Sequence, residues 1–240
     1  MTPYLYEGLI LPERAQLSLQ FQVHFKHLTS SVSAIAHVSV VLNQVAVWLY
    51  SDVEWDIFDL RNVVKTILQN QVAAIGYLKG YAYEVEIRRV LHPELGIDCV
   101  FGIDIPCIAE RNESIDLDAR IALIREKTTG VEGVLLNRCF NDLVMAMKSP
   151  DDTGFYCYRA IESLRQHCII KFKLPPEDKH KKMQWEKLRE IAQCDESTTR
   201  YIQKSADPVR HGDVMSITSE DRKTLFLKTW DIVDSYIKNA

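Results

Sequence analysis

The chain has 240 residues, of which 47% are hydrophobic and 26% are charged, and its formal net charge is −4. This length and composition suit one large or two small globular domains that can bury a core without disulfides or metal ions. The longest apolar runs are far shorter than the roughly 20 residues that cross a bilayer. The N-terminus also lacks a basic start followed by an apolar stretch. We therefore expect a cytoplasmic protein with no membrane partner.

Charge is distributed unevenly along the chain. Residues 1–150 carry 13 Lys and Arg against 18 Asp and Glu, whereas residues 151–240 carry 16 against 15. Any surface for nucleic acid is therefore expected in the C-terminal part, because phosphates need local positive charge. The six cysteines are scattered and never form Cys-x-x-Cys. This spacing favours reduced core thiols over disulfides or metal ligands.

The N-terminal part alternates apolar and polar residues in the manner of β-strands. Residues 14–26 do so most clearly, since Leu17 to Phe25 contribute an apolar side chain at every second position. Residues 35–42 and 45–50 are rich in β-branched and aromatic residues, and the intervening Asn43-Gln44 predicts a hairpin turn.

A helix is expected next, over residues 56–78, because apolar residues recur there every three or four positions and Gly80 supplies a left-handed stop. Strands are expected again over residues 83–88 and 99–105. Residues 1–110 are thus predicted to form a small mixed α/β-sheet domain.

Beyond Pro106 the strand pattern ends and helical periodicity takes over, so residues 111–240 are predicted to form an all-α helical bundle and the chain as a whole an α+β protein. Helices are expected over residues 116–128, 134–147, 152–171, 185–194, 198–206 and 219–238. Pro208 is expected to end the helix before it, with Arg210-His211-Gly212 as its cap. Ser219 is expected to cap the last helix.

Several familiar sites are absent from the sequence. It contains no Gly-x-Gly-x-x-Gly, no Gly-x4-Gly-Lys, no Gly-x-Ser-x-Gly and no His-Glu-x-x-His. Glu84 and Glu86 share a strand face and, with Asp98 or Asp104, offer oxygen ligands for a divalent ion. A solvated sheet face explains them as well and is the preferred interpretation. We therefore expect no metal and no cofactor.

The C-terminal helices carry the most informative pattern. Tyr158-Arg-Ala-Ile-Glu-Ser-Leu164 is followed by Trp185, by Ala206-Asp-Pro-Val-Arg-His-Gly212 and by a closing amphipathic helix. Over about residues 150–240 this order resembles the HEPN superfamily (higher eukaryotes and prokaryotes nucleotide-binding). The resemblance implies a helical bundle, a homodimer formed through the helical domain, and RNA or a nucleotide as the partner. Many members are metal-independent ribonucleases of toxin or antiviral defence systems.

The HEPN active motif is an Arg, four to six residues and a His, often written Arg-Asn-x-x-x-His and followed by Gly. His211 and Gly212 match it. In place of Arg-Asn this chain has Ala206-Asp207, so the motif is degenerate. Lys204, six residues before His211, or the adjacent Arg210 would have to hold the phosphate, and Lys is the weaker substitute for a guanidinium.

The resemblance assigns a role to each candidate residue. His211 would be the general acid or base, because an imidazole exchanges protons near neutral pH. Arg210 or Lys204 would bind the scissile phosphate. Glu162 and Arg159, on the long helix, would orient His211, and Arg159 would join the nucleic-acid-binding set. Two alternatives stay open, namely capping of a helix end by Arg210-His211-Gly212, and a non-catalytic interaction or dimerisation protein.

Overall fold

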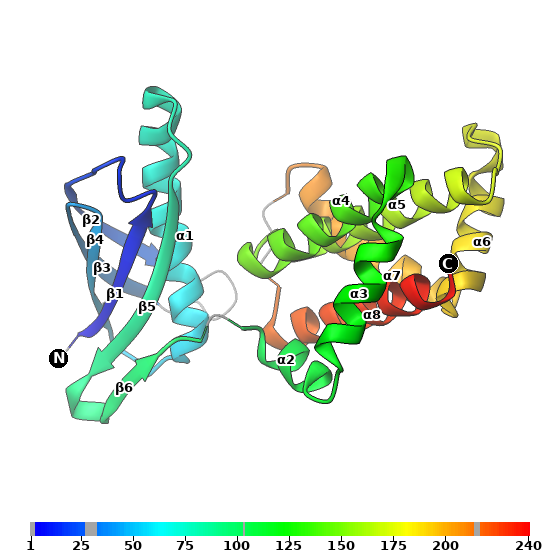
Figure 1. Cartoon of the computed structure of the whole chain (residues 1–240). Coiled ribbons are helices and arrows are strands. Elements are labelled where there is room, and N and C mark those ends of the chain that lie inside the picture. Colours follow the sequence, from blue (N-terminus) through cyan, green and yellow to red (C-terminus); the bar gives the residue numbers. More distant parts are fainter. Residues whose placement is uncertain (1–2, 27–32, 103, 214–216) are drawn as a thin grey trace. The chain divides into compact units, whose positions relative to one another are not determined.

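The computed structural model describes residues 3–26, 33–102, 104–213 and 217–240. The chain forms two compact units, residues 1–103 and 104–240 (Figure 1). An α+β sheet domain followed by a helical domain is therefore confirmed. The division lies between 103 and 104 where the sequence suggested 110 and 111, because helix α2 (Pro106–Asn112) contacts α8 (Ser219–Asn239) of the helical unit.

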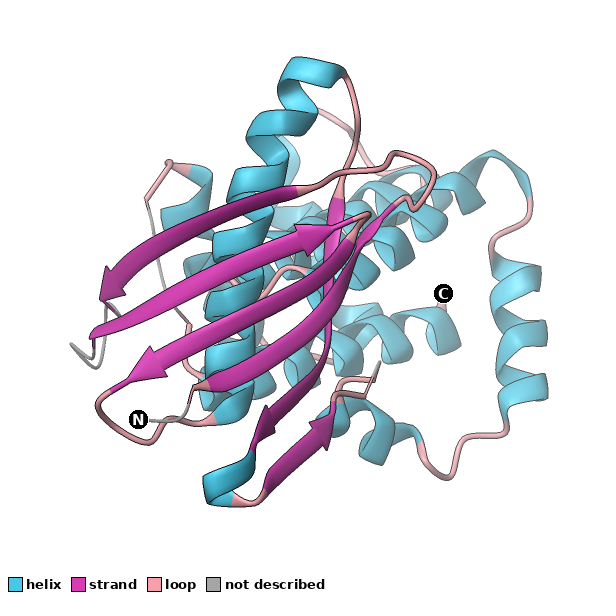
Figure 2. Cartoon of the chain, turned by 90° about the vertical axis from the view of Figure 1, so that its left-hand side faces the viewer, coloured by secondary structure: helices cyan, strands magenta, loops and turns pink. Residues whose placement is uncertain are grey.

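The first unit is an antiparallel sheet with one helix against it. Its strands follow the order β2-β3-β4-β1-β5-β6, and α1 (Ile57–Lys79) lies behind the sheet in Figure 2. Leu60, Val64 and Leu68 of α1 are buried in the core that the helix shares with the sheet. The strands are β1 (Tyr4–Leu11), β2 (Leu19–Lys26), β3 (Ser33–Val41), β4 (Gln44–Ser51), β5 (Glu84–His92) and β6 (Ile97–Val100).

Strand β1 was not predicted, and it lies between β4 and β5 inside the sheet. The predicted strand over residues 99–105 was also placed too late, since β6 ends at Val100. The hairpin of β3 and β4 is confirmed, but its turn is Leu42-Asn43, one residue earlier than expected. Both turn residues have positive φ, 48° and 68°, which matches the right-handed twist of the paired strands.

Asn43 explains how the edge of this sheet is organised. Its side chain is buried and accepts a hydrogen bond from the Leu17 N–H at 2.6 Å, while its amide donates to the Ile10 carbonyl at 2.9 Å. One side chain therefore joins the end of β1, the segment before β2 and the β3–β4 turn. Such a buried amide is stable only because its polar atoms are paired.

The second unit is helical and is organised around α5 (Thr153–Lys171), which contacts four other helices. The sequence indicated one polar side for α5, but Ser163, Arg165 and His167 are buried too, since neighbours surround the helix. Thr218, not Ser219, caps α8, and its hydroxyl accepts from the Asp221 N–H at 3.1 Å. The remaining helices are α3 (Leu117–Lys127), α4 (Gly130–Lys148), α6 (Lys181–Ala192) and α7 (Glu196–Arg210).

Candidate functional site

The segment that carries the HEPN-like motif forms the C-terminal end of α7. Contrary to expectation, Pro208 lies inside this helix, which continues to Arg210. The proline lacks an N–H to donate to the preceding turn, and the helix ends two residues later. The predicted cap is confirmed: His211 is the C-cap, and Gly212 has a φ of 85°. Only glycine adopts that left-handed conformation without cost.

The helical period of α7 separates the candidate residues. Ile202 and Ala206 are buried on one side of α7. Arg210 lies on the same side, one helical turn after Ala206. Lys204 and His211 are seven residues apart, which places both on the opposite, exposed side of the helix. Within the described residues, no hydrogen bond or ion pair of the His211 side chain is found. One copy of the chain therefore does not bring Arg210, Lys204 and His211 together.

Arg210 instead belongs to a layered arrangement of cations and aromatic rings. Its guanidinium carbon lies 5.2 Å from the centre of the Tyr158 ring. Tyr158 is stacked on Trp185 of α6, with ring centres 6.2 Å apart and planes inclined by 17°. The guanidinium carbon of Arg165 lies 5.3 Å from the Trp185 ring. We call these four side chains the Tyr158–Trp185 stack; in it, two arginines contact a pair of parallel rings.

Arg165 is the unusual member of this stack. It is only 9% exposed, yet within the described parts of the chain it forms no ion pair. Its Nη1 donates to the neutral Gln184 side chain at 2.7 Å, and its buried Nε has no partner there. A buried cation that forms no ion pair is costly unless other groups offset its charge.

Glu162 lies beside the same stack, one helical turn after Tyr158. Burial, followed by the neighbouring Glu162 carboxylate, raises the pKa of Tyr158 to about 12, although Arg210 and Arg165 act in the opposite direction. The phenol therefore stays protonated at neutral pH. Glu162 and Arg210 therefore both lie near Tyr158. Among the described residues, Glu162 forms no hydrogen bond with His211.

Arg159, another predicted member, is held at a different side of α5. It forms an ion pair and hydrogen bond with Asp142 of α4, and its guanidinium lies over the Phe155 and Tyr156 rings at 5.4 and 5.5 Å. Burial raises the pKa of Asp142, and the Arg159 guanidinium opposes that rise. Arg159 thus joins a buried carboxylate rather than the Tyr158–Trp185 stack.

Further positive charge lies near Trp185. Lys181 and Lys182 are exposed at the start of α6, one turn before the half-buried Trp185. Lys182 pairs only at 4.0 Å with Glu186, a contact that solvent weakens. The N-terminal turn of α6 therefore adds two lysines to the side of the helix near Trp185.

Sequence reasoning missed Arg165 and Gln184. Arg165 falls on the same helical side as Tyr158, seven residues earlier, and Gln184 precedes Trp185. The seven-residue spacing of Tyr158 and Arg165 could have indicated that both lie on one side of the helix. The lack of an ion pair at Arg165 within the described residues depends on the packing of α5 and α6 and was not visible in the sequence.

Other features of the structure bear on the earlier expectations. The six cysteines are free thiols, of which Cys139, Cys157 and Cys168 are buried. Among the described residues, no group of three His, Cys, Asp or Glu side chains is arranged to hold a metal ion. In the same part of the chain no helix combines the length and apolar character needed to cross a bilayer.

Comparisons with known proteins give one clear result. Residues 121–240 match the family model described as Domain of unknown function (DUF8168) C-terminal domain. Residues 4–101 match the model described as Domain of unknown function (DUF8168) N-terminal domain. The two matched regions correspond to the helical unit and the sheet unit. No curated protein and no solved structure gives a significant match.

Proposed function

The chain belongs to the DUF8168 family, whose N- and C-terminal domains it contains in order, and from this premise we propose that its helical unit binds RNA or a nucleotide at the Tyr158–Trp185 stack. The observation that carries the proposal is the buried Arg165 without a counter-ion. A phosphate beside Arg165 supplies the missing negative charge and accepts charge-assisted hydrogen bonds from the guanidinium.

The surroundings of Arg165 suit a nucleotide better than a simple anion. Proteins that bind single strands combine stacking rings with cations along the backbone path. Here Trp185 is half-buried and has Tyr158 as a parallel neighbour, while Arg210, Lys181 and Lys182 supply exposed positive charge. A base stacked on the exposed part of Trp185 would place its phosphates near these cations.

Cleavage is the second candidate, and it rests on the HEPN resemblance of His211 and Gly212. His211 is exposed, and in this role it would act as general acid or base on a ribose 2′-hydroxyl or a leaving oxygen. Because His211 and Arg210 lie on different sides of α7, a catalytic Arg–His pair requires an arginine from a second copy. This candidate therefore depends on a homodimer that brings the two copies' motifs together.

A homodimer through the helical unit is part of the proposal. Val131, Val134 and Met145 fall along one side of α4 and are 85%, 63% and 38% exposed. Exposed apolar side chains gathered on one helix side favour association with another surface. If the Tyr158–Trp185 stack binds no nucleic acid, this surface supports the alternative function, that of a non-catalytic interaction or dimerisation protein.

The test for binding uses a fluorescently labelled single-stranded RNA and follows its anisotropy. Arg165→Met and Arg210→Ala are each expected to weaken binding about tenfold, since a charged hydrogen bond contributes roughly 1.5–3 kcal/mol. Arg200→Ala is the matched control, because Arg200 is an exposed arginine of α7 that pairs with Glu196. Equal affinity of the wild type and both stack variants would refute the site.

The test for cleavage incubates purified protein with total RNA in the presence of a metal chelator. Wild type is expected to cleave and His211→Ala is expected not to. Cleavage by both proteins, or by neither, removes the catalytic role of His211 and leaves the binding proposal to stand or fall on the anisotropy titration.

A further inference from the structure

The sheet unit carries a second candidate binding site, on the face opposite to α1. Cross-strand pairing arranges its side chains in rows across β2, β3 and β4. One row is Gln22, His37 and Trp48, and the next is Gln20, Ser39 and Ala46. Side chains at directly paired positions on one face are close neighbours, so these rows form a continuous surface.

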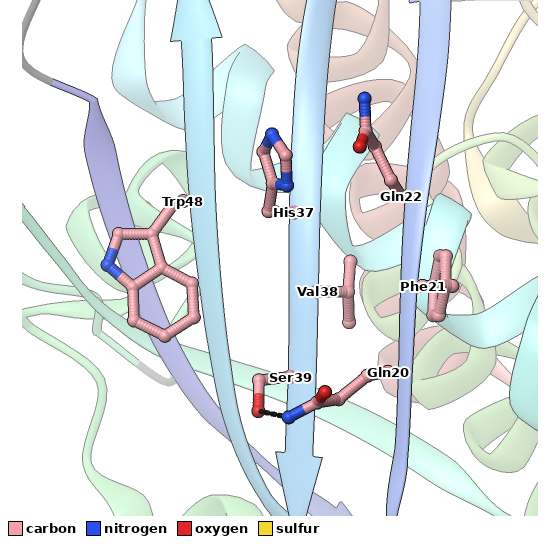
Figure 3. A pocket seen from close by; sticks show the side chains of 7 residues that line it. All are labelled: Gln20, Phe21, Gln22, His37, Val38, Ser39 and Trp48. Atoms are coloured by element: carbon pink, nitrogen blue, oxygen red, sulfur yellow. Dashed lines mark hydrogen bonds between the residues drawn. The ribbon is translucent and has the colours of Figure 1, made fainter.

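The difference in size between the two rows creates a hollow. Ser39 and Ala46 are small, whereas the adjacent row carries the larger Trp48 and His37. The hollow has a volume of about 410 Å³, and it is also bordered by Phe21 and Val38, whose side chains belong to the core on the other face of the sheet. Figure 3 shows the indole ring of Trp48 face on, with Gln20 and Gln22 reaching from β2 on the other side of β3.

Trp48 is 38% exposed on this face. A tryptophan face left in water forgoes a large hydrophobic gain, and exposed aromatic rings are frequent in binding sites. Its cross-strand neighbour His37 contacts the Tyr50 ring edge-to-face at 5.5 Å and extends the aromatic surface. The hollow is therefore bounded on one side by a flat, apolar ring.

The polar groups of the hollow are amides, a hydroxyl and the His37 imidazole. The Gln20 amide donates to the Ser39 hydroxyl at 3.3 Å, and the Gln22 amide contacts the His24 ring at 2.9 Å. Each amide also has a carbonyl oxygen with free acceptor capacity. The lining can thus donate and accept hydrogen bonds, and it contains no Lys, Arg, Asp or Glu.

This chemistry narrows the class of ligand. Residues 1–103 carry seven Lys and Arg against ten Asp and Glu, so the net charge of the unit does not favour phosphates. An extended peptide pairs with a sheet edge through its main chain rather than with a sheet face. A sugar ring offers an apolar C–H face for the indole and hydroxyl groups that both donate and accept. We propose that this hollow binds a sugar unit of an uncharged saccharide.

The proposal is independent of the function proposed for the helical unit. Its test screens the full chain against an array of neutral oligosaccharides, with fragments of glucan, mannan, xylan and chitin. The best binder is then titrated by the tryptophan fluorescence of the protein. For a shallow site of this size we expect a dissociation constant on the order of 1 mM or tighter.

Variants locate the binding. Trp48→Ala is expected to weaken it at least about tenfold, because it removes the stacking surface. Ser39→Leu keeps the indole but fills part of the hollow and is expected to weaken binding as much. Val41→Ala is the matched control, since Val41 is an exposed residue of the same strand outside the lining. Thermal melts check that each variant is folded.

Three results would overturn the inference. One is no binding by any array member in titrations up to about 10 mM. Another is binding that persists unchanged in both Trp48→Ala and Ser39→Leu. The third comes from adenosine and cytidine, tested in parallel, since tighter Trp48-dependent binding of either would show that the hollow accepts a nucleobase instead.

Discussion

Two arginines of the same helix are expected to respond to the same substitution to different extents. Arg159 pairs with Asp142, which is 2% exposed, whereas Arg165 is buried without a carboxylate. Arg159→Met leaves the Asp142 carboxylate buried without its cation. Arg165→Met removes a buried cation that nothing in the described residues neutralises.

The magnitudes follow from these surroundings. Removing one partner of a fully buried pair costs about 3–5 kcal/mol. The Arg159 side chain is 38% exposed, and Asp142 can bind a proton when its partner is lost, so we expect about 2 kcal/mol of destabilisation at neutral pH. For Arg165→Met, relief of the buried charge offsets the lost bond to Gln184, and we expect a change within about 1 kcal/mol.

The destabilisation by Arg159→Met is also expected to depend on pH. Burial raises the pKa of Asp142 in the folded protein above its usual value. A raised carboxyl pKa means that the folded state binds the proton more tightly, so stability falls as pH rises from the unfolded pKa through the folded one. Loss of the guanidinium raises the folded pKa further. The defect of Arg159→Met should therefore be largest at neutral pH and shrink on acidification.

Urea denaturation followed by far-UV circular dichroism measures these changes across a pH series. Arg159→Met combined with Asp142→Leu supplies the control, because the double variant no longer buries a charge and should recover most of the lost stability. The reasoning is refuted if Arg165→Met is the more damaging substitution, or if the defect of Arg159→Met is the same at acidic and neutral pH.

Three further outcomes are expected from single substitutions. Gly154→Ala should lower the free energy of unfolding by about 1–3 kcal/mol, measured in urea, because its Cβ would lie 2.2 Å from the Ser205 carbonyl oxygen, and an unchanged midpoint contradicts this close approach. Val134→Glu should convert a dimer to a monomer in sedimentation velocity without changing the far-UV circular dichroism spectrum, and a monomeric wild type would remove the premise. Thr218→Ala should cost about 1 kcal/mol in thermal unfolding, since it removes the α8 cap, and no loss would place the cap elsewhere.

The fold was largely predictable wherever one side of an element faces water. Strand β2 and helix α1 show clear periods because each has a polar side. The bounds of α1 were found to within one residue, whereas the strand predicted over residues 14–26 begins only at Leu19. Strand β1 was missed for the opposite reason. It lies between two other strands, and Tyr4, Tyr6, Leu9 and Ile10 are all buried, so its alternation is interrupted. The bulge at Glu7 and Gly8 shifts the pattern further.

The candidate site, like the fold, could be predicted only in part from the sequence. The sequence singled out Arg210, His211 and Glu162, and periodicity along α7 already separates Arg210 from His211. What local pattern cannot show is which side chains from α5, α6 and α7 meet. The stacking of Tyr158 on Trp185, and the pairing of Arg159 with Asp142, arise between residues that are 27 and 17 positions apart.

By itself, the sequence determined the two kinds of domain, the helix end at Gly80, and the residue types available for phosphate chemistry. These follow from local sterics and from the period of apolar residues, which act over a few residues. Only the tertiary structure decided that Arg165 is buried without a counter-ion and that Ser39 lines a hollow beside Trp48. Both depend on which elements pack together, because burial and charge neutralisation are properties of neighbours in space.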